Sequence, residues 1–152
     1  MTEISTDVGG HPSLRDNAEP LLVVDDLKTH FTLPAGIVKA VDGVSFELYP
    51  GRTVGIVGES GSGKTVLARS VMQLTTGANV QNAGSVMVDG RDVMSISKKQ
   101  MTNVWGLEMS MVFQDPMTSL NPVVKIGRQL TEHVRRHLKI SKDEARTTGI
   151  EL

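Results

Sequence analysis

The alternation of apolar and polar residues divides the first half of the chain into strand-like and helix-like segments. Residues 21–33 and 37–51 are rich in β-branched and apolar side chains, and the second of these segments stops at a Pro-Gly turn, so they predict a pair of strands. The run TVGIVG at 53–58 predicts a short strand buried on both faces. A Gly/Ser loop follows, and apolar side chains then recur at helical spacing over 67–74. The order strand, glycine loop, helix is typical of an α/β fold.

The second half of the chain continues with both kinds of element. SVMVDG at 85–90 predicts a strand that enters a tight Asp-Gly turn, and residues 95–105 predict a short polar helix. MSMVF at 109–113 predicts another buried strand. An apolar stripe predicts a helix over 126–138, and the capping box at 141–144 predicts the start of a further helix.

Residues 1–20 mix glycine, proline and polar residues without any period, which predicts a flexible tail. The apolar runs of the chain are only a few residues long, so we expect no membrane-spanning helix. The absence of cysteine excludes disulfides and thiolate metal sites and is compatible with a reducing compartment. With 16 basic against 17 acidic residues, bulk charge gives no reason to expect a nucleic-acid partner.

The segment GESGSGKT at 58–65 carries the clearest chemistry, because it matches the GxxxxGK[ST] phosphate-loop pattern. Glycines let successive N–H groups point inward around phosphates, and the following helix directs its positive end at the same charge. Lys64 is expected to reach the β- and γ-phosphates, and the Thr65 hydroxyl is expected to bind Mg²⁺. The residues expected to contact the nucleotide are Gly58, Glu59, Ser60, Gly61, Ser62, Gly63, Lys64, Thr65 and Val66.

A phosphate loop alone leaves several kinds of protein open. Ras-like GTPases also need an Asn-Lys-x-Asp motif that reads guanine, and this motif does not occur in the sequence. A small-molecule kinase with a P-loop remains an alternative at this point. The alternative without a binding function is a Gly/Ser linker that happens to contain a lysine.

Two segments resemble one family in particular, the ATP-binding subunits of ABC transporters of the oligopeptide, dipeptide and nickel importer type. VGESGSGKT resembles the Walker A loop of that group, and VFQDPMTSLNP at 112–122 resembles its Q-loop. Residues 40–51 and 84–93 are also similar, so that the likeness covers about residues 21–152. It implies an α/β fold: a P-loop NTPase core with an antiparallel β subdomain and the beginning of a helical subdomain.

The resemblance also implies roles for individual residues. Gln114 would be the Q-loop glutamine, which contacts Mg²⁺ or the attacking water, so that Gln114 and Lys64 form the catalytic set and Gln114 and Thr65 the metal ligands. The alternative for Gln114 is a loop amide that satisfies a local turn. Phe31 is similar in placement to the aromatic residue that stacks on adenine, and the alternative is an ordinary core residue.

The chain departs from the family pattern in three motifs that do not occur in residues 1–152: a Walker B strand with its catalytic glutamate, an LSGGQ signature and a switch histidine. Val86–Asp89 looks like Walker B, but Gly90 stands where glutamate is required. We therefore expect residues 21–152 to form an incomplete ABC-type nucleotide-binding domain. Such a chain is expected to bind ATP with slow or no turnover, and whether it is an ATPase stays open.

The resemblance thus implies a truncated ATP-binding subunit of an ABC importer for peptides or similar solutes, with ATP and Mg²⁺ as cofactors. Its expected place is the cytoplasmic face of the cell membrane. Its expected partners are an integral membrane subunit and a second ATP-binding subunit, and nucleic acid is not among them. The alternatives are a non-catalytic nucleotide-binding fragment without transport activity and, less favoured, the P-loop kinase.

Overall fold

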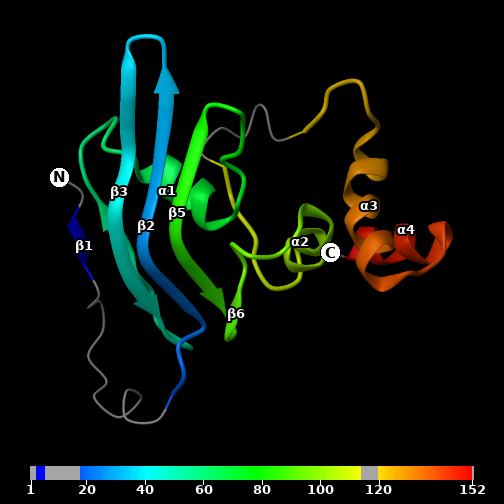
Figure 1. Cartoon of the computed structure of the whole chain (residues 1–152). Helices are drawn as coiled ribbons and strands as arrows, with labels where there is room; N and C mark the ends of the chain where they lie inside the picture. The colour runs from blue at the N-terminus through cyan, green and yellow to red at the C-terminus, as the bar shows by residue number, and fades with distance from the viewer. Residues whose placement is uncertain (1–2, 6–17, 114–119, 152) are drawn as a thin grey trace. The chain divides into compact units, whose positions relative to one another are not determined.

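The computed structural model describes residues 3–5, 18–113 and 120–151, which form two compact units, Met1–Met101 and Thr102–Leu152. Each unit is described by itself. The elements, labelled in Figure 1, are β1 (Glu3–Ser5), β2 (Leu22–Leu33), β3 (Gly36–Leu48), β4 (Gly55–Val57), α1 (Lys64–Val71), β5 (Val80–Val88), β6 (Arg91–Asp92), α2 (Lys98–Val104), α3 (Ile126–Leu138) and α4 (Lys142–Glu151). The first unit contains all six strands and α1, the second contains α3 and α4, and α2 crosses the boundary.

The main sheet of the first unit has four antiparallel strands in the order β3-β2-β5-β6. The long β2–β3 hairpin confirms the predicted strand pair, and β5 contains the strand predicted at 85–90. Asp89 and Gly90 both adopt positive φ, 47° and 72°, as a two-residue hairpin turn requires. The predicted Asp-Gly turn is therefore confirmed, and it leads into β6.

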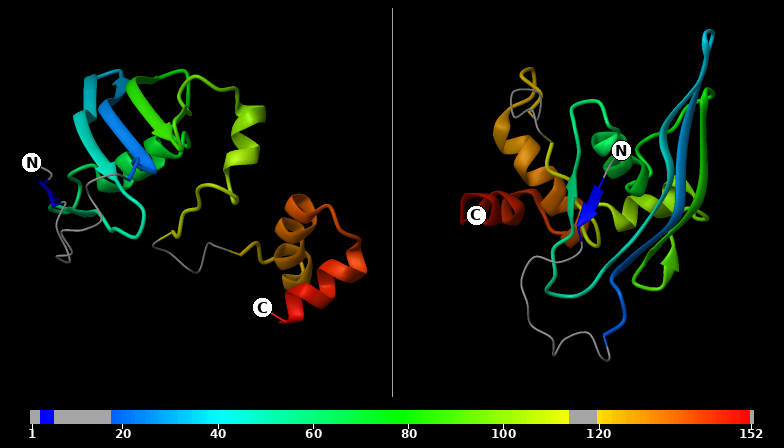
Figure 2. Two further views of the ribbon diagram at one scale, coloured as in Figure 1. Left: turned by 90° about the horizontal axis from the view of Figure 1, so that it is seen from below. Right: turned by 90° about the vertical axis from the view of Figure 1, so that its left-hand side faces the viewer.

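Helix α1 lies against one face of this sheet, as Figure 2 shows. The fully buried side chains of the interface include Leu27 and Val86 from the strands and Leu67 from the helix. The burial of Leu67 and Val71 follows from the helical spacing of apolar residues predicted over 67–74. Leu74, the third position of that spacing, is 40% exposed, because α1 ends at Val71 and the helical stripe ends with it.

The short strand before the glycine loop is less buried than its apolar sequence predicts. Strand β4 extends only over Gly55–Val57, and Val57 is 54% exposed. In the described part of the chain β4 pairs only with β1, so no neighbouring strand covers its other edge. The prediction of burial on both faces was therefore wrong. Strand β1 itself was not anticipated, because it lies in the segment predicted to be a flexible tail.

The second predicted buried strand, residues 109–113, is also wrong. Met109 makes an isolated bridge with Trp105, but the residues after it form no strand, and Val112 is 96% exposed. An apolar run forms a strand only where a neighbouring strand accepts its backbone hydrogen bonds. Beyond that single bridge, no strand among the described residues pairs with this run.

Helices α3 and α4 of the second unit pack on each other. The predicted capping box is confirmed: the Ser141 N–H donates to Glu144 Oε2 at 2.9 Å, and the Glu144 N–H donates to Ser141 Oγ at 3.3 Å. Both predicted helices form as expected. Most of the apolar stripe of α3 is exposed, with Ile126 and Leu138 each 60% accessible.

The capping box gives a testable pH dependence. Hydrogen bonds from the hydroxyl and the backbone N–H of Ser141 lower the pKa of Glu144 below its usual 4.5. A carboxylate with a lowered folded-state pKa stabilises α4 above the unfolded-state pKa, and this contribution is lost as the pH falls through the folded-state pKa. An NMR titration should place the Glu144 midpoint below 4.5, and Ser141→Ala should return it toward that value. Ser97→Ala, in the equivalent cap of α2, should leave the midpoint unchanged.

Candidate functional site

The glycine loop at 58–63 joins β4 to α1 and folds as its sequence predicts. Gly61 and Gly63 have φ of 82° and 94°, a region that residues with a Cβ rarely adopt. The Ser62 N–H donates to the Glu59 carbonyl at 3.2 Å, which closes a tight turn. The loop therefore curls back on itself immediately before the helix.

The ammonium group of Lys64 lies inside this loop. Its Nζ donates to the carbonyl oxygens of Gly58 at 2.8 Å and Glu59 at 2.7 Å, and to Ser62 Oγ at 3.3 Å. These three acceptors match the three donors of an ammonium group. Among the ion pairs of the described residues none involves Lys64, so its charge is held by neutral dipoles and remains available to an anion.

The N-terminus of α1 adds further positive character to the loop. Gly63 is the N-cap and has no side chain, and the first turn of the helix contains no acidic residue. The backbone N–H groups at the start of a helix have no carbonyl partner within the helix, and they carry the positive end of its dipole. Thr65 is exposed in this turn, and Val66 is partly buried. N–H groups, a cation and an exposed hydroxyl together fit a polyphosphate with its metal ion.

The loop also packs closely against the sheet. A Cβ at Gly63 would lie 2.2 Å from the carbonyl oxygen of Ala40 on β3, whereas nothing lies within 4 Å of a Cβ at Gly61. Real Cβ atoms do not approach backbone oxygen so closely. Gly63 is therefore required both by its φ and by the contact with β3.

Phe31 lies on β2, in unbroken register with β5 from Lys28 onward. Side chains alternate between the two faces of a strand, so Phe31 shares a face with the fully buried Leu27 and Thr29, the face that α1 covers. Phe31 is only partly buried there. The stacking of Phe31 on adenine stays a prediction. The predicted Q-loop glutamine, Gln114, lies outside the described residues.

Sequence reasoning missed a polar contact between β2 and the last turn of α1. The hydroxyl of Thr29 donates to Ser70 Oγ at 2.8 Å, and the two side chains are 0% and 3% exposed. A threonine in a strand and a serine near the end of a helix are unremarkable by themselves, so no local signal distinguishes them.

A cluster of charges ties β2 to β3 on the other face of the hairpin. Asp42 accepts from Lys39 at 3.1 Å and contacts His30 Nε2 at 2.9 Å. The hydrogen bond from Lys39, and then the one from His30, lower the pKa of Asp42. The cluster therefore helps to hold the strand that carries Phe31.

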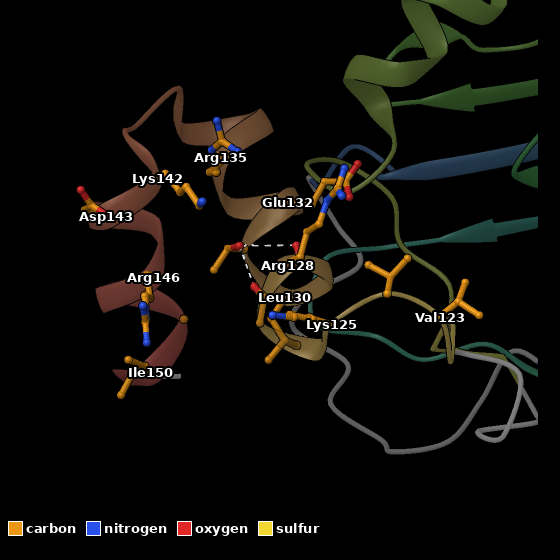
Figure 3. Close-up of a pocket in the computed structure, with 14 residues that line it drawn as sticks. Val123, Lys125, Arg128, Leu130, Glu132, Arg135, Lys142, Asp143, Arg146 and Ile150 are labelled. Atoms are coloured by element: carbon orange, nitrogen blue, oxygen red, sulfur yellow. Dashed lines mark hydrogen bonds between the residues drawn. The ribbon is translucent and has the colours of Figure 1, made fainter.

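The second unit has a groove of about 1170 Å³ between α3 and α4, shown in Figure 3. Basic residues outnumber acidic ones along its walls, and apolar side chains such as Leu130 and Ile150 lie between them. The charged lining residues are Lys125, Arg128, Glu132, Arg135, Lys142, Asp143 and Arg146. No chemistry-bearing motif lines this groove, so the glycine loop remains the candidate site.

Among the described residues, no three His, Cys, Asp or Glu side chains gather as they would around a metal ion. None of the helices described is both long and apolar enough to cross a bilayer.

Comparison with known proteins places the chain in a family. Residues 41–150 match the ABC transporter family. The oligopeptide transport ATP-binding protein OppD of Bacillus subtilis (strain 168) is 46% identical over 133 residues, which are 87% of this chain and 37% of that protein. The dipeptide transport ATP-binding protein DppD of the same organism is 45% identical over 129 residues, 84% of this chain and 38% of that protein. The chain spans about two fifths of the length of the curated relatives it matches.

A solved structure shows the same fold. The ATP-binding cassette MJ0796, in a dimeric post-hydrolysis state bound to ADP and Pi, superposes with a TM-score of 0.63 at 17% identity and covers 86% of this chain and 54% of the cassette. The fold of the chain is therefore that of an α/β P-loop NTPase, as the sequence predicts. Because the family match spans most of the chain and agrees with both the relatives and the fold, the chain belongs to the ABC transporter family.

Proposed function

We propose that residues 58–66 bind the triphosphate of ATP together with Mg²⁺, and that Phe31 on β2 stacks on its adenine. The observation that carries this proposal is the position of the Lys64 ammonium group inside the glycine loop, held by the Gly58 and Glu59 carbonyls at the start of α1. A cation fixed among neutral dipoles beside a helix N-terminus is a site for a multiply charged anion.

The hydrogen bonds of Lys64 indicate how the anion enters. The contact with Ser62 Oγ, at 3.3 Å, is the longest of the three, so it is the one that a phosphate oxygen replaces most easily. The two carbonyl contacts at 2.8 and 2.7 Å then stay in place and keep the ammonium directed into the loop. The exposed hydroxyl of Thr65 would ligate Mg²⁺, a cation that prefers oxygen ligands.

We further propose that the chain is part of an ATP-binding subunit of a peptide importer. Relatives named for oligopeptide and dipeptide transport support the solute class, and a cassette described as dimeric supports a second ATP-binding subunit. We also propose an integral membrane subunit as partner, with this chain at its cytoplasmic face, and membership of the ABC transporter family supports this. In this proposal Gln114 links the nucleotide to the membrane subunit. The family match gives no support to a small-molecule kinase.

For residues 1–152 measured alone we propose nucleotide binding rather than turnover, since no Walker B glutamate and no LSGGQ segment occur among them. A binding fragment without transport activity is the second candidate function. Association with a membrane complex distinguishes these two candidate functions, because a transport subunit would associate with such a complex and a binding fragment would not.

Calorimetric titration of the chain with ATP, with and without Mg²⁺, tests the proposed site. We expect saturable binding that Mg²⁺ strengthens and that inorganic tripolyphosphate competes away. Heat that does not saturate at millimolar ATP would contradict the proposal.

Replacing Thr65 by valine should remove most of the benefit of Mg²⁺. Valine keeps the shape of the side chain and loses the hydroxyl, so ATP affinity in Mg²⁺ should fall by about tenfold, while affinity without the metal should change little. The measurement is the same titration in magnesium and in a chelator. Thr53→Val, at an exposed threonine before β4, is the matched control and should behave like the unmodified chain. An unchanged response to Mg²⁺ in Thr65→Val would exclude Thr65 as a ligand.

A further inference from the structure

Thr29 and Ser70 form a buried hydrogen bond between the sheet and α1. Thr29 Oγ1 donates to Ser70 Oγ at 2.8 Å, and these two residues are the buried polar ones among the described residues. Burying a hydroxyl without a partner is unfavourable, so each of these groups depends on the other.

The surroundings of this pair give it a specific effect. Next to it the interface consists of apolar side chains, among them Leu27 on β2 and Leu67 and Val71 on α1. Apolar contacts have no preferred direction, so they specify the position of the helix less sharply than a hydrogen bond does. A hydrogen bond exists at one position only, because sliding the helix leaves two buried hydroxyls unpaired. The pair therefore fixes the position of α1 along β2.

Each partner belongs to an element that carries one part of the proposed ATP site. Thr29 lies two residues before Phe31 on β2, and the two share a face of the sheet. Ser70 lies in the last turn of α1, whose first residue is Lys64. A slide of α1 along β2 by less than one helical turn would already move the phosphate loop relative to Phe31.

A second contact joins the start of α1 to β3, the other strand of the hairpin. Gly63 packs so closely on the Ala40 carbonyl of β3 that no Cβ fits between them. The β2–β3 hairpin is thus attached to the phosphate loop at one end of α1 and to Ser70 at the other. Two attachment points define the orientation of a helix on a sheet, whereas one leaves it free to pivot.

We propose that Thr29 and Ser70 are positioning residues that set the distance between the phosphate loop and Phe31, and thereby the affinity for the whole nucleotide. This inference rests on the proposed function and adds to it that base and phosphate recognition are coupled through a buried bond that touches neither. ATP reports on both parts of the site at once. Inorganic tripolyphosphate reports on the phosphate loop alone, so the ratio of the two affinities measures the coupling.

The test compares Thr29→Val with the unmodified chain in titrations with ATP and with tripolyphosphate. Valine fills the same volume without the hydroxyl. We expect ATP affinity to fall about fivefold, since a displaced base keeps only part of its stacking energy, and tripolyphosphate affinity to stay within about twofold. Thr32→Val, at an exposed threonine on the same strand, is the control and should change neither affinity.

Further variants separate positioning from general stability. Thr29→Ser keeps a hydroxyl and should restore the ratio of the two affinities. The double variant Thr29→Val/Ser70→Ala leaves no buried hydroxyl unpaired, so it should recover thermal stability while the low ratio persists. Equal losses of ATP and tripolyphosphate affinity, or a stability loss with an unchanged ratio, would overturn the inference and leave the pair a purely structural contact.

These outcomes differ from those that test the proposed function. A chain that binds neither ATP nor tripolyphosphate would refute the phosphate site itself and the inference with it. A chain that binds both ligands, with a ratio unaffected by Thr29→Val, would keep the phosphate site and refute only the coupling.

Discussion

Replacing Lys64 by alanine is expected to weaken ATP binding by at least about 100-fold, because a hydrogen bond between a charged donor and a phosphate is worth about 1.5–3 kcal/mol and Lys64 is the one basic residue of the segment 58–65. In the free chain the Lys64 ammonium binds the Gly58 and Glu59 carbonyls. Without it these two dipoles face the incoming phosphate with their negative ends. The variant therefore loses an attraction and gains a repulsion.

Lys98→Ala is the matched control for this prediction. Lys98 is an exposed lysine at the start of α2, so its removal changes the net charge by the same amount without touching the loop. Calorimetry measures affinity, and circular dichroism verifies that both variants fold. Equal ATP affinity in Lys64→Ala and Lys98→Ala would refute the phosphate site.

The parts of the fold that the sequence predicts correctly are those that local chemistry decides. The glycines at 61 and 63 permit the positive φ angles that the loop needs, and Ser141 and Glu144 cap their helix with groups only three residues apart. The Asp-Gly turn at 89–90 likewise depends on the conformations that these two residues adopt. In each case the interacting groups are neighbours in the chain, so a short pattern contains all the information.

The predictions that failed depend on neighbours that a short pattern does not contain. The runs at 53–58 and 109–113 are apolar, and their burial requires neighbouring strands along both edges and helices packed on both faces. Among the described residues, 55–57 pair with β1 alone and 109–113 with a single bridge, so Val57 and Val112 are exposed. The Thr29–Ser70 bond is nonlocal in the same sense, since its partners are 41 residues apart. The glycine loop was therefore predictable, and the contact that positions it was not.

Replacement of the glycine at the end of the loop should strongly destabilise the fold. Gly63→Ala places a methyl group 2.2 Å from the Ala40 carbonyl oxygen and imposes a φ of 94° on a residue with a Cβ. Backbone strain of this kind costs about 1–3 kcal/mol, and relieving the clash adds to it, so we expect the free energy of unfolding to fall by at least about 3 kcal/mol. ATP binding should be lost together with the loop conformation.

Gly51→Ala separates the two causes in this prediction. Gly51 also has a positive φ, 68°, but nothing lies within 4 Å of a Cβ built there. Its replacement should lower the free energy of unfolding only by the cost of the backbone angle, about 1–2 kcal/mol, and should leave ATP affinity unchanged. Urea denaturation followed by circular dichroism measures both losses. If the two variants were destabilised equally, the contact between Gly63 and Ala40 would contribute nothing. A larger loss in Gly63→Ala, with ATP binding abolished in that variant alone, would mean that the packing of the loop on β3 holds the phosphate site in shape.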